Sequence, residues 1–107
     1  MSFHAFDVAL ELVRSVQQPL TVIAQHDPNL ASQLRRAVSS VPLNLAEGNR
    51  RAGRDRLHLF RIAAGSTAEA VAGLRIAEAW GYVEAGALEP ALTFCDRVQA
   101  MCWRLTH

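Results

Sequence analysis

Hydrophobic residues recur along the chain at spacings of three, four and seven, which is the period of an α-helix with one buried face. This pattern predicts a first helix from Phe3 to about Gln25. Its predicted apolar stripe consists of Phe3, Phe6, Leu10, Val13, Leu20 and Ile23. Pro19 lies inside the stretch and has no backbone donor, so we expect a kink or an early end there.

A second helix is predicted from Leu30 to about Arg51, after a turn at residues 26–29 in which Asp27 or Asn29 can cap the helix. Its predicted buried face consists of Leu30, Leu34, Val38, Val41 and Leu45. Pro42 disfavours helical geometry at the residue before it, so one kinked helix and two shorter helices both stay open.

The third predicted helix, from Asp55 to about Trp80, carries two apolar stripes and therefore needs more than one packing partner. One stripe contains Leu57, Phe60, Ala64, Thr67, Val71 and Leu74, and the other contains Leu59, Ile62, Ala63, Ala70, Ile76 and Ala77. A fourth helix is predicted from about Ala87, after a stop at Gly81. Its predicted inward residues are Leu88, Ala91, Leu92, Cys95, Val98, Cys102 and Leu105.

Four such segments with short connections predict an all-α protein of one domain, residues 1–107, folded as an antiparallel up-down-up-down four-helix bundle. The second stripe of the third helix would be a large apolar patch if left in water, so we expect a homo-oligomer. No signal sequence follows Met1 and no apolar run reaches membrane-spanning length, which favours a cytoplasmic protein without membrane contact.

The composition fits this fold and points to no catalytic centre. Cys95 and Cys102 are seven residues apart on one helix, about 10 Å along its axis, so we expect buried reduced thiols and no bond between them. The histidines are scattered without metal-ligand spacing, at His4, His26, His58 and His107. No phosphate-binding glycine loop or nucleophilic serine motif occurs. The sequence therefore predicts a non-enzymatic protein with no metal and no cofactor.

Charge is distributed unevenly along the chain. The chain contains 11 Arg and no Lys. Residues 35–61 contain seven Arg against two acids, a net charge of +5, and the remainder has a net charge of −4. The predicted basic patch consists of Arg35, Arg36, Arg50, Arg51, Arg54 and Arg56, with Arg61 nearby. Such a patch can neutralise the phosphates of RNA or DNA. The alternative is a solvated face whose arginines form local ion pairs.

Asn44 and Glu47 are three residues apart and share a face of the second predicted helix. They form either a polar binding site or a structural network that holds this helix to its neighbours. Hydrogen bonding to nearby arginines satisfies an amide and a carboxylate, so we favour the structural network.

Two sequence stretches resemble the signatures of a known family. Residues 40–48 read S-V-P-L-N-L-A-E-G within the longer match from Ser32 to Arg51, and residues 60–69 read F-R-I-A-A-G-S-T-A-E. Together they resemble the four-helix-bundle proteins encoded in intervening sequences of bacterial 23S ribosomal RNA genes. The resemblance covers nearly the whole chain. It implies an antiparallel bundle that assembles into a ring-like homopentamer, similar to the accessory protein of diversity-generating retroelements, which binds nucleic acid and partners a reverse transcriptase.

The resemblance places the positions of interest at Arg35, Arg36, Asn44, Glu47, Arg50 and Arg51. The chain departs from the family pattern at Arg54-Asp55-Arg56, where lysines are common, and at Val8 and Ala9, where a Trp is common. We expect a protein that binds RNA or DNA backbones through its arginines. The alternative is a scaffold that binds a protein partner through an outer apolar helix face.

Overall fold

The computed structural model describes residues 3–107, and this part of the chain consists of four helices without a β-strand. They are α1 (His4–His26), α2 (Pro28–Asn49), α3 (Gly53–Ala79) and α4 (Glu89–Thr106). The prediction of an all-α, four-helix protein is confirmed. The predicted domain, residues 1–107, also includes residues 1–2, which lie outside the described residues.

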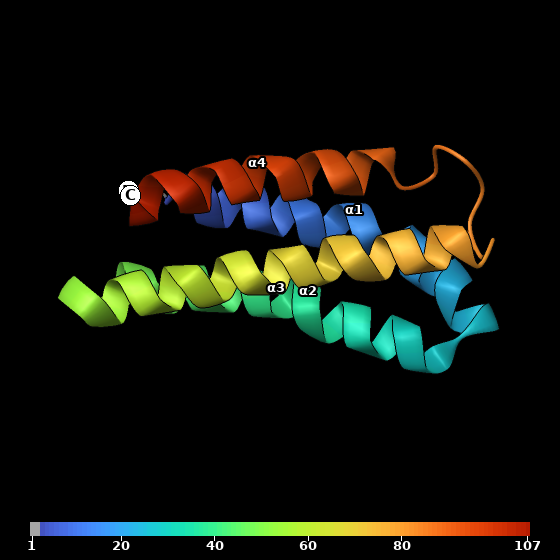
Figure 1. Cartoon of the computed structure of the whole chain (residues 1–107), viewed down its shortest axis with the longest axis horizontal. Coiled ribbons are helices and arrows are strands. Elements are labelled where there is room, and N and C mark those ends of the chain that lie inside the picture. Colours follow the sequence, from blue (N-terminus) through green and yellow to red (C-terminus); the bar gives the residue numbers. More distant parts are fainter. Residues whose placement is uncertain (1–2) are drawn as a thin grey trace.

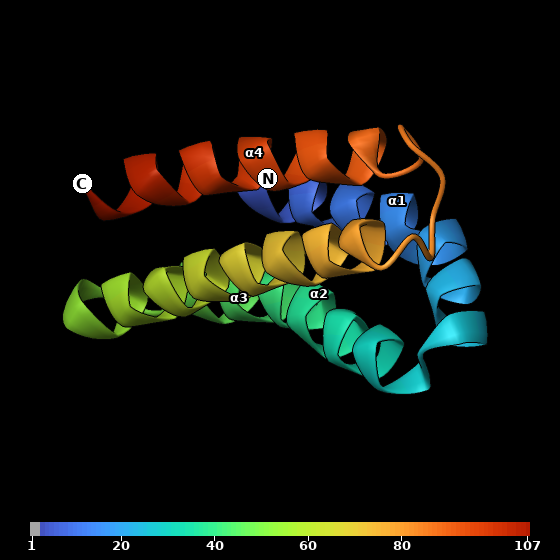
Figure 2. The same cartoon turned by 45° about the vertical axis from the view of Figure 1, so that its right-hand side comes forward.

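The helices form an elongated bundle in which each packs against the next and α1 packs against α4. Its extents are 42 × 22 × 21 Å. Figures 1 and 2 show the α2–α3 turn at one end of the long axis, together with the end of α4. The α1–α2 turn and the α3–α4 connection lie at the other end. We call these the turn end and the loop end.

The core follows the same division. One cluster joins the start of α1, the end of α2, the start of α3 and the end of α4, with Phe60 fully buried among Val8, Leu45 and Val98. The other cluster fills the loop end, and Phe94 of α4 packs against both. Buried apolar residues therefore extend along the whole bundle. Their packing determines which parts of the four helices lie together at each end.

The predicted stripe of α1 is wrong for its first half. The buried face comprises Ala5, Val8, Ala9, Leu12, Val16, Leu20 and Ile23. Phe6, Leu10 and Val13 are only half-buried. Small residues let α1 approach its partners α2 and α4 closely, so Ala and Val occupy the interior and larger side chains lie beside it. The predicted stripe followed the larger apolar side chains, and these lie on the face next to the buried one.

Both internal prolines are accommodated within continuous helices. α1 continues through Pro19 to His26, and Figure 2 shows its last part bending away from the direction of its first part. α2 continues through the buried Pro42, so the one-helix alternative is correct. The predicted cap of α2 is confirmed, because the Leu30 backbone N–H donates to Asp27 Oδ1 at 3.0 Å.

α3 buries one face rather than two. This face draws on both predicted stripes and comprises Phe60, Ala63, Thr67, Ala70, Gly73, Leu74 and Ala77. Ile62 and Ile76, which belong to the second stripe, stay exposed. Along α4 the predicted inward residues are confirmed as buried, except that Leu105 is only half-buried.

The two cysteines are buried and unpaired, as predicted. Burial raises the pKa of the Cys95 thiol to about 11, with a further contribution from the nearby Asp96 carboxylate. Burial alone raises the pKa of Cys102 to about 11. Both thiols are therefore protonated and unreactive at neutral pH.

Within residues 3–107, no helix has the length and apolar character needed to cross a membrane. The same residues contain no group of three or more His, Cys, Asp or Glu side chains placed to hold a metal ion.

Candidate nucleic-acid interface

Two glycines determine how the chain turns between α2 and α3. A Cβ atom at Gly48 would lie 2.7 Å from Phe60 Cε1, so only glycine allows α2 to approach α3 this closely. Gly53 has a φ of +61°, a left-handed conformation that other residues rarely adopt. These positions produce a turn of three residues, 50–52, and bring the arginines on both sides of it together.

Arg56 is bound to the protein around it. Its Nη1 donates to the carbonyl oxygens of Gly48 at 3.4 Å and Asn49 at 3.3 Å. Its guanidinium carbon lies 4.8 Å from the centre of the Phe60 ring. A cation on the last carbonyls of a helix satisfies free acceptors and interacts favourably with the helix dipole. Arg56 therefore caps α2 and links the turn to the core.

The other arginines of the turn are more open to solvent. Arg51 donates from Nε and Nη2 to Glu47 Oε1, at 3.1 and 2.9 Å. Arg50 Nη1 lies 3.9 Å from Glu47 Oε2, and the Arg50 side chain is 80% exposed. Exposed pairs of this kind contribute about 0–1 kcal/mol, so a phosphate can compete for these arginines. Arg54 is exposed and makes no ion pair within the described part of the chain.

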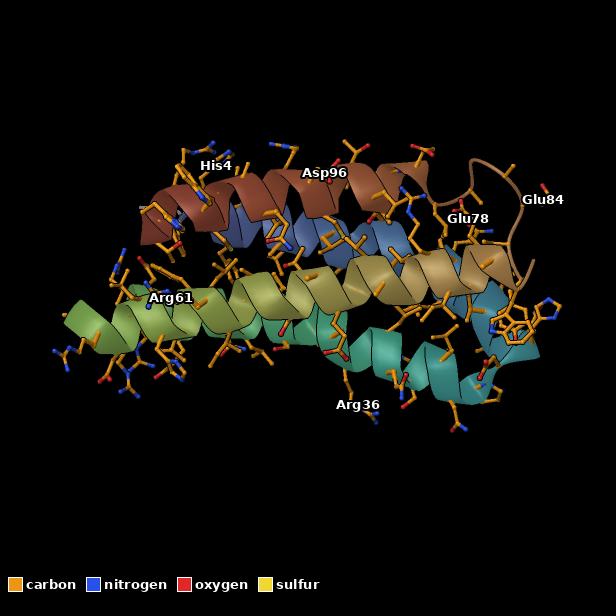
Figure 3. The ribbon with its side chains drawn as sticks, viewed as in Figure 1. His4, Arg36, Arg61, Glu78, Glu84 and Asp96 are labelled. Atoms are coloured by element: carbon orange, nitrogen blue, oxygen red, sulfur yellow. The ribbon has the colours of Figure 1, made fainter. Side chains whose placement is uncertain are left out.

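The six predicted arginines do not form one patch. Arg36 precedes Arg50 by fourteen residues, which is about 21 Å along a helix. Its Nη1 donates to Ser32 Oγ at 3.2 Å, and Figure 3 shows the side chain pointing away from the middle of the bundle. Arg35 lies beside a groove between α1 and α2 that Val13 and Gln17 also line. The turn end therefore holds Arg50, Arg51, Arg54 and Arg56, and the other two lie apart.

Asn44 and Glu47 have different partners. Asn44 Nδ2 donates to the carbonyl oxygen and to Oγ of Ser40, at 2.8 and 2.9 Å. The Ser40 hydroxyl in turn lies 2.8 Å from the Ser66 hydroxyl on α3. Asn44 is thereby connected to α3 through two serines that lie within the two family-like stretches and to which the sequence assigned no role. The four-residue spacing of Ser40 and Asn44 was the available signal.

Opposite charges gather at the two ends of the bundle. When each helix is divided at its midpoint, the turn-end half has seven Arg against four acids, a formal charge of +3. The loop-end half has four Arg against six acids, a formal charge of −2. Figure 3 shows Arg61 toward the turn end, and Glu78 and Glu84 toward the loop end. A polyanion is therefore attracted to the turn end.

Sequence reasoning also missed an aromatic pair at the turn end. Trp103 is 62% exposed. Its ring stacks on that of His107, with centroids 4.5 Å apart and an interplanar angle of 10°. The sequence did carry a signal for this pair. Trp103 is not among the predicted inward residues of the last helix, so the helical period places it on the solvent-facing side.

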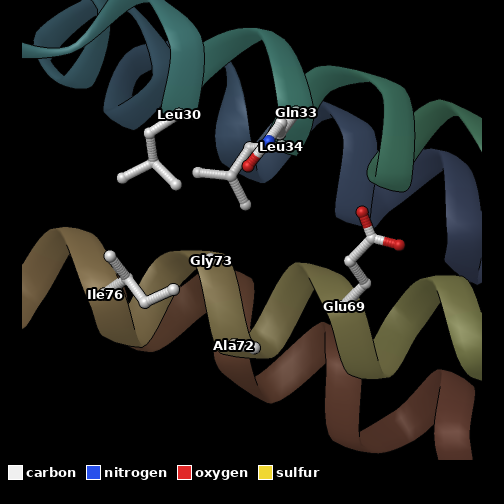
Figure 4. Close-up of a pocket in the computed structure, with 7 residues that line it drawn as sticks. All are labelled: Leu30, Gln33, Leu34, Glu69, Ala72, Gly73 and Ile76. Carbon is white, nitrogen blue, oxygen red and sulfur yellow. The ribbon is translucent and has the colours of Figure 1, made fainter.

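A small hollow lies between α2 and α3 (Figure 4). It measures about 100 Å³ and is lined by Leu30, Gln33, Leu34, Glu69, Ala72, Gly73 and Ile76. Ligand pockets for small molecules usually measure about 300–1,000 Å³. The hollow is therefore a surface depression beside the exposed Ile76, and it does not enclose a ligand site.

Comparison with known proteins identifies the family of this chain. A model of the 23S rRNA-intervening sequence protein family matches residues 2–104. The chain belongs to this family. The resemblance inferred from residues 32–51 and 60–69 is thereby confirmed, and the first of these stretches forms most of α2 and the start of the turn in this 23S rRNA-intervening sequence protein.

A solved structure has the same fold. The crystal structure of a protein of unknown function from the S23 ribosomal protein family of Bacteroides thetaiotaomicron superposes with a TM-score of 0.86. The two chains share 18% sequence identity over 95% of this chain and 97% of the other. A search of proteins with curated functions found no match.

Proposed function

We propose that this 23S rRNA-intervening sequence protein is a non-enzymatic, antiparallel four-helix bundle that binds RNA or DNA backbones through its turn end. The exposure of Arg50, Arg51 and Arg54 on one three-residue turn and its helix flanks supports this proposal. Their only acidic ion-pair partners among the described residues are Glu47 and Asp55, at the solvent-exposed surface.

The proposed contacts predict the salt dependence of binding. Three arginines can contact about three phosphates in each subunit. The logarithm of the binding constant then falls against the logarithm of salt concentration with a slope of about −2 for a single strand. Contacts to the phosphates carry no sequence information, so binding is tolerant of sequence.

The test is a fluorescence-anisotropy titration of labelled RNA and DNA across a salt series. The double variant Arg50→Glu/Arg54→Glu should abolish binding. Arg35→Glu/Arg36→Glu is the matched control, because it changes the charge by the same amount on α2, about 20 Å from the turn. Equal losses in both variants would show that net charge alone determines binding and would remove the turn end from the proposal.

The proposal includes assembly as a homo-oligomer, a pentamer by family resemblance. We assign self-association to the α2–α3 face, defined by the exposed residues Leu43, Ile62 and Ile76. Leu43 and Ile62 each lie about one helical turn from the Ser40–Ser66 contact, so they lie at the same level on two neighbouring helices. Exposed apolar patches are a common feature of association surfaces.

Light scattering on the wild type and on Ile62→Glu tests the assembly. We expect a mass of several subunits for the wild type and a lower mass for the variant. The alternative function uses the same apolar face for a different protein, as a scaffold does. Under that alternative the wild type is monomeric, and the Arg50→Glu/Arg54→Glu variant keeps its partner.

A further inference from the structure

The exposed indole of Trp103 forms one wall of a hollow between α3 and α4 at the turn end. The hollow measures about 330 Å³. Arg61 and Ala64 line it from α3, Gln99 and Trp103 line it from α4, and His107 lines it from just after α4. Gln99 is held in place by a 3.1 Å hydrogen bond from its Nε2 to the Ala64 carbonyl oxygen. His107 stacks on the indole, and its Nδ1 lies 3.0 Å from the Trp103 carbonyl oxygen, which holds the imidazole in place.

The lining suits a flat, anionic ligand. Arg61 is the only lining residue whose side chain is always charged, and none of the lining side chains is a carboxylate. An exposed indole offers a surface on which a nucleobase can stack, and a guanidinium beside it can pair with the phosphate of the same nucleotide. A base inside a duplex is already stacked between its neighbours, so only an unpaired base can use this surface.

Arg61 of the hollow lies on the same helix as Arg54 beside the turn. Arg54, His58 and Arg61 are spaced by four and three residues, which places them on one exposed face of α3. Arg54 and Arg61 are about 10 Å apart along the helix axis. About three steps of a helical strand span this distance, at roughly 3.4 Å each. A strand whose phosphates contact Arg54 therefore reaches Trp103 within a few nucleotides.

The second exposed tryptophan lacks these features. Trp80 is 69% exposed and stacks on Tyr82 with centroids 6.3 Å apart. It follows the end of α3 at the loop end, two residues after Glu78 and four before Glu84. These carboxylates repel a polyanion. Trp80 is thus a matched control of the same residue type and similar exposure.

We propose that Trp103, with Arg61, forms a stacking subsite for an unpaired base of single-stranded nucleic acid. This inference rests on the proposed backbone binding at the turn end and adds a preference for single strands. Aromatic stacking strengthens binding by a factor that alanine substitution can measure, about 5- to 150-fold per base.

The test compares Trp103→Ala with Trp80→Ala, using a labelled 20-nucleotide oligoadenylate RNA and a 20-base-pair RNA duplex. Trp103→Ala should weaken binding of the single strand about 5- to 150-fold and leave duplex binding unchanged. Trp80→Ala should change neither. A Trp80→Phe protein retains Trp103 as its only tryptophan, and its fluorescence should be quenched as the single strand binds.

Two results would overturn the subsite. One is single-strand binding by Trp103→Ala at wild-type affinity, together with unquenched Trp103 fluorescence at saturation. The other is a smaller oligomer mass for Trp103→Ala in light scattering, which would make this face a contact between proteins. Failure of the proposed backbone binding gives a different result. In that case Arg50→Glu/Arg54→Glu would still bind the duplex, whereas Trp103→Ala would lose binding of the single strand.

Discussion

The contact between Gly48 and Phe60 gives a prediction whose magnitude follows from the geometry. In Gly48→Ala the new methyl group would lie 2.7 Å from Phe60 Cε1 and 2.9 Å from Phe60 Cδ1. Phe60 is fully buried, its ring centre is 6.0 Å from that of Phe3, and Arg56 lies over it. The ring therefore cannot move without displacing its neighbours. Overpacking of this kind costs about 1–3 kcal/mol.

Part of this cost is offset, because alanine is favoured over glycine inside a helix by about 1 kcal/mol. Gly65 provides the control, since it lies within α3 and a Cβ atom there would meet nothing within 4 Å. Gly65→Ala should raise the free energy of unfolding by about 0.5–1 kcal/mol. Gly48→Ala should lower it by up to about 2 kcal/mol.

Urea denaturation followed by far-ultraviolet circular dichroism measures both variants, at one fixed protein concentration. The difference between them isolates the steric cost at Gly48. Equal stability of Gly48→Ala and Gly65→Ala would refute the close approach of α2 to α3. It would also refute the steric explanation for glycine at position 48.

Three further predictions concern protonation, the polar network and the helix cap. Between pH 9 and 11 the unfolded state loses the protons of Cys95 and Cys102 while the folded state keeps them, so the free energy of unfolding should fall as pH rises. The fall should be up to about 1.4 kcal/mol per pH unit for each thiol, and urea titrations of the wild type and the double Cys→Ala variant should differ in this slope. Asn44→Ala should destabilise the protein by about 1–2 kcal/mol in thermal denaturation, since it removes two hydrogen bonds to Ser40. Arg56→Met should lower stability by about 1 kcal/mol through loss of the α2 cap, whereas Arg50→Met should change it by less than about 0.5 kcal/mol in the same assay.

Periodicity was sufficient to predict the helices. α4 followed its pattern most closely, because its inward positions from Leu88 to Cys102 are all apolar and its outward positions are mostly polar. In α1 the pattern indicated the wrong face, because Phe6 and Leu10 are larger than the buried Ala5 and Ala9. Which face is buried depends on how closely the partner helices approach, and that distance is not encoded in one helix alone.

The candidate interface was only partly accessible from the sequence. Seven arginines within residues 35–61 indicated a basic segment, but linear proximity did not show that Arg35 and Arg36 are separated from the turn. Nor did it show that Arg56 caps α2. Trp103 is more than forty residues from the turn in sequence, and the packing of α4 on α3 brings it to the same end.

The separation of charge along the bundle has a consequence for symmetry. In a cyclic assembly whose axis runs parallel to the helices, every turn end lies on one rim of the ring and every loop end on the other. Each added subunit then increases the positive potential of one rim and the negative potential of the other. Such a ring has two electrically distinct sides although each chain carries a formal charge of only +1. A nucleic acid strand would follow the circumference of one rim, and the opposite rim would stay free for a positively charged protein.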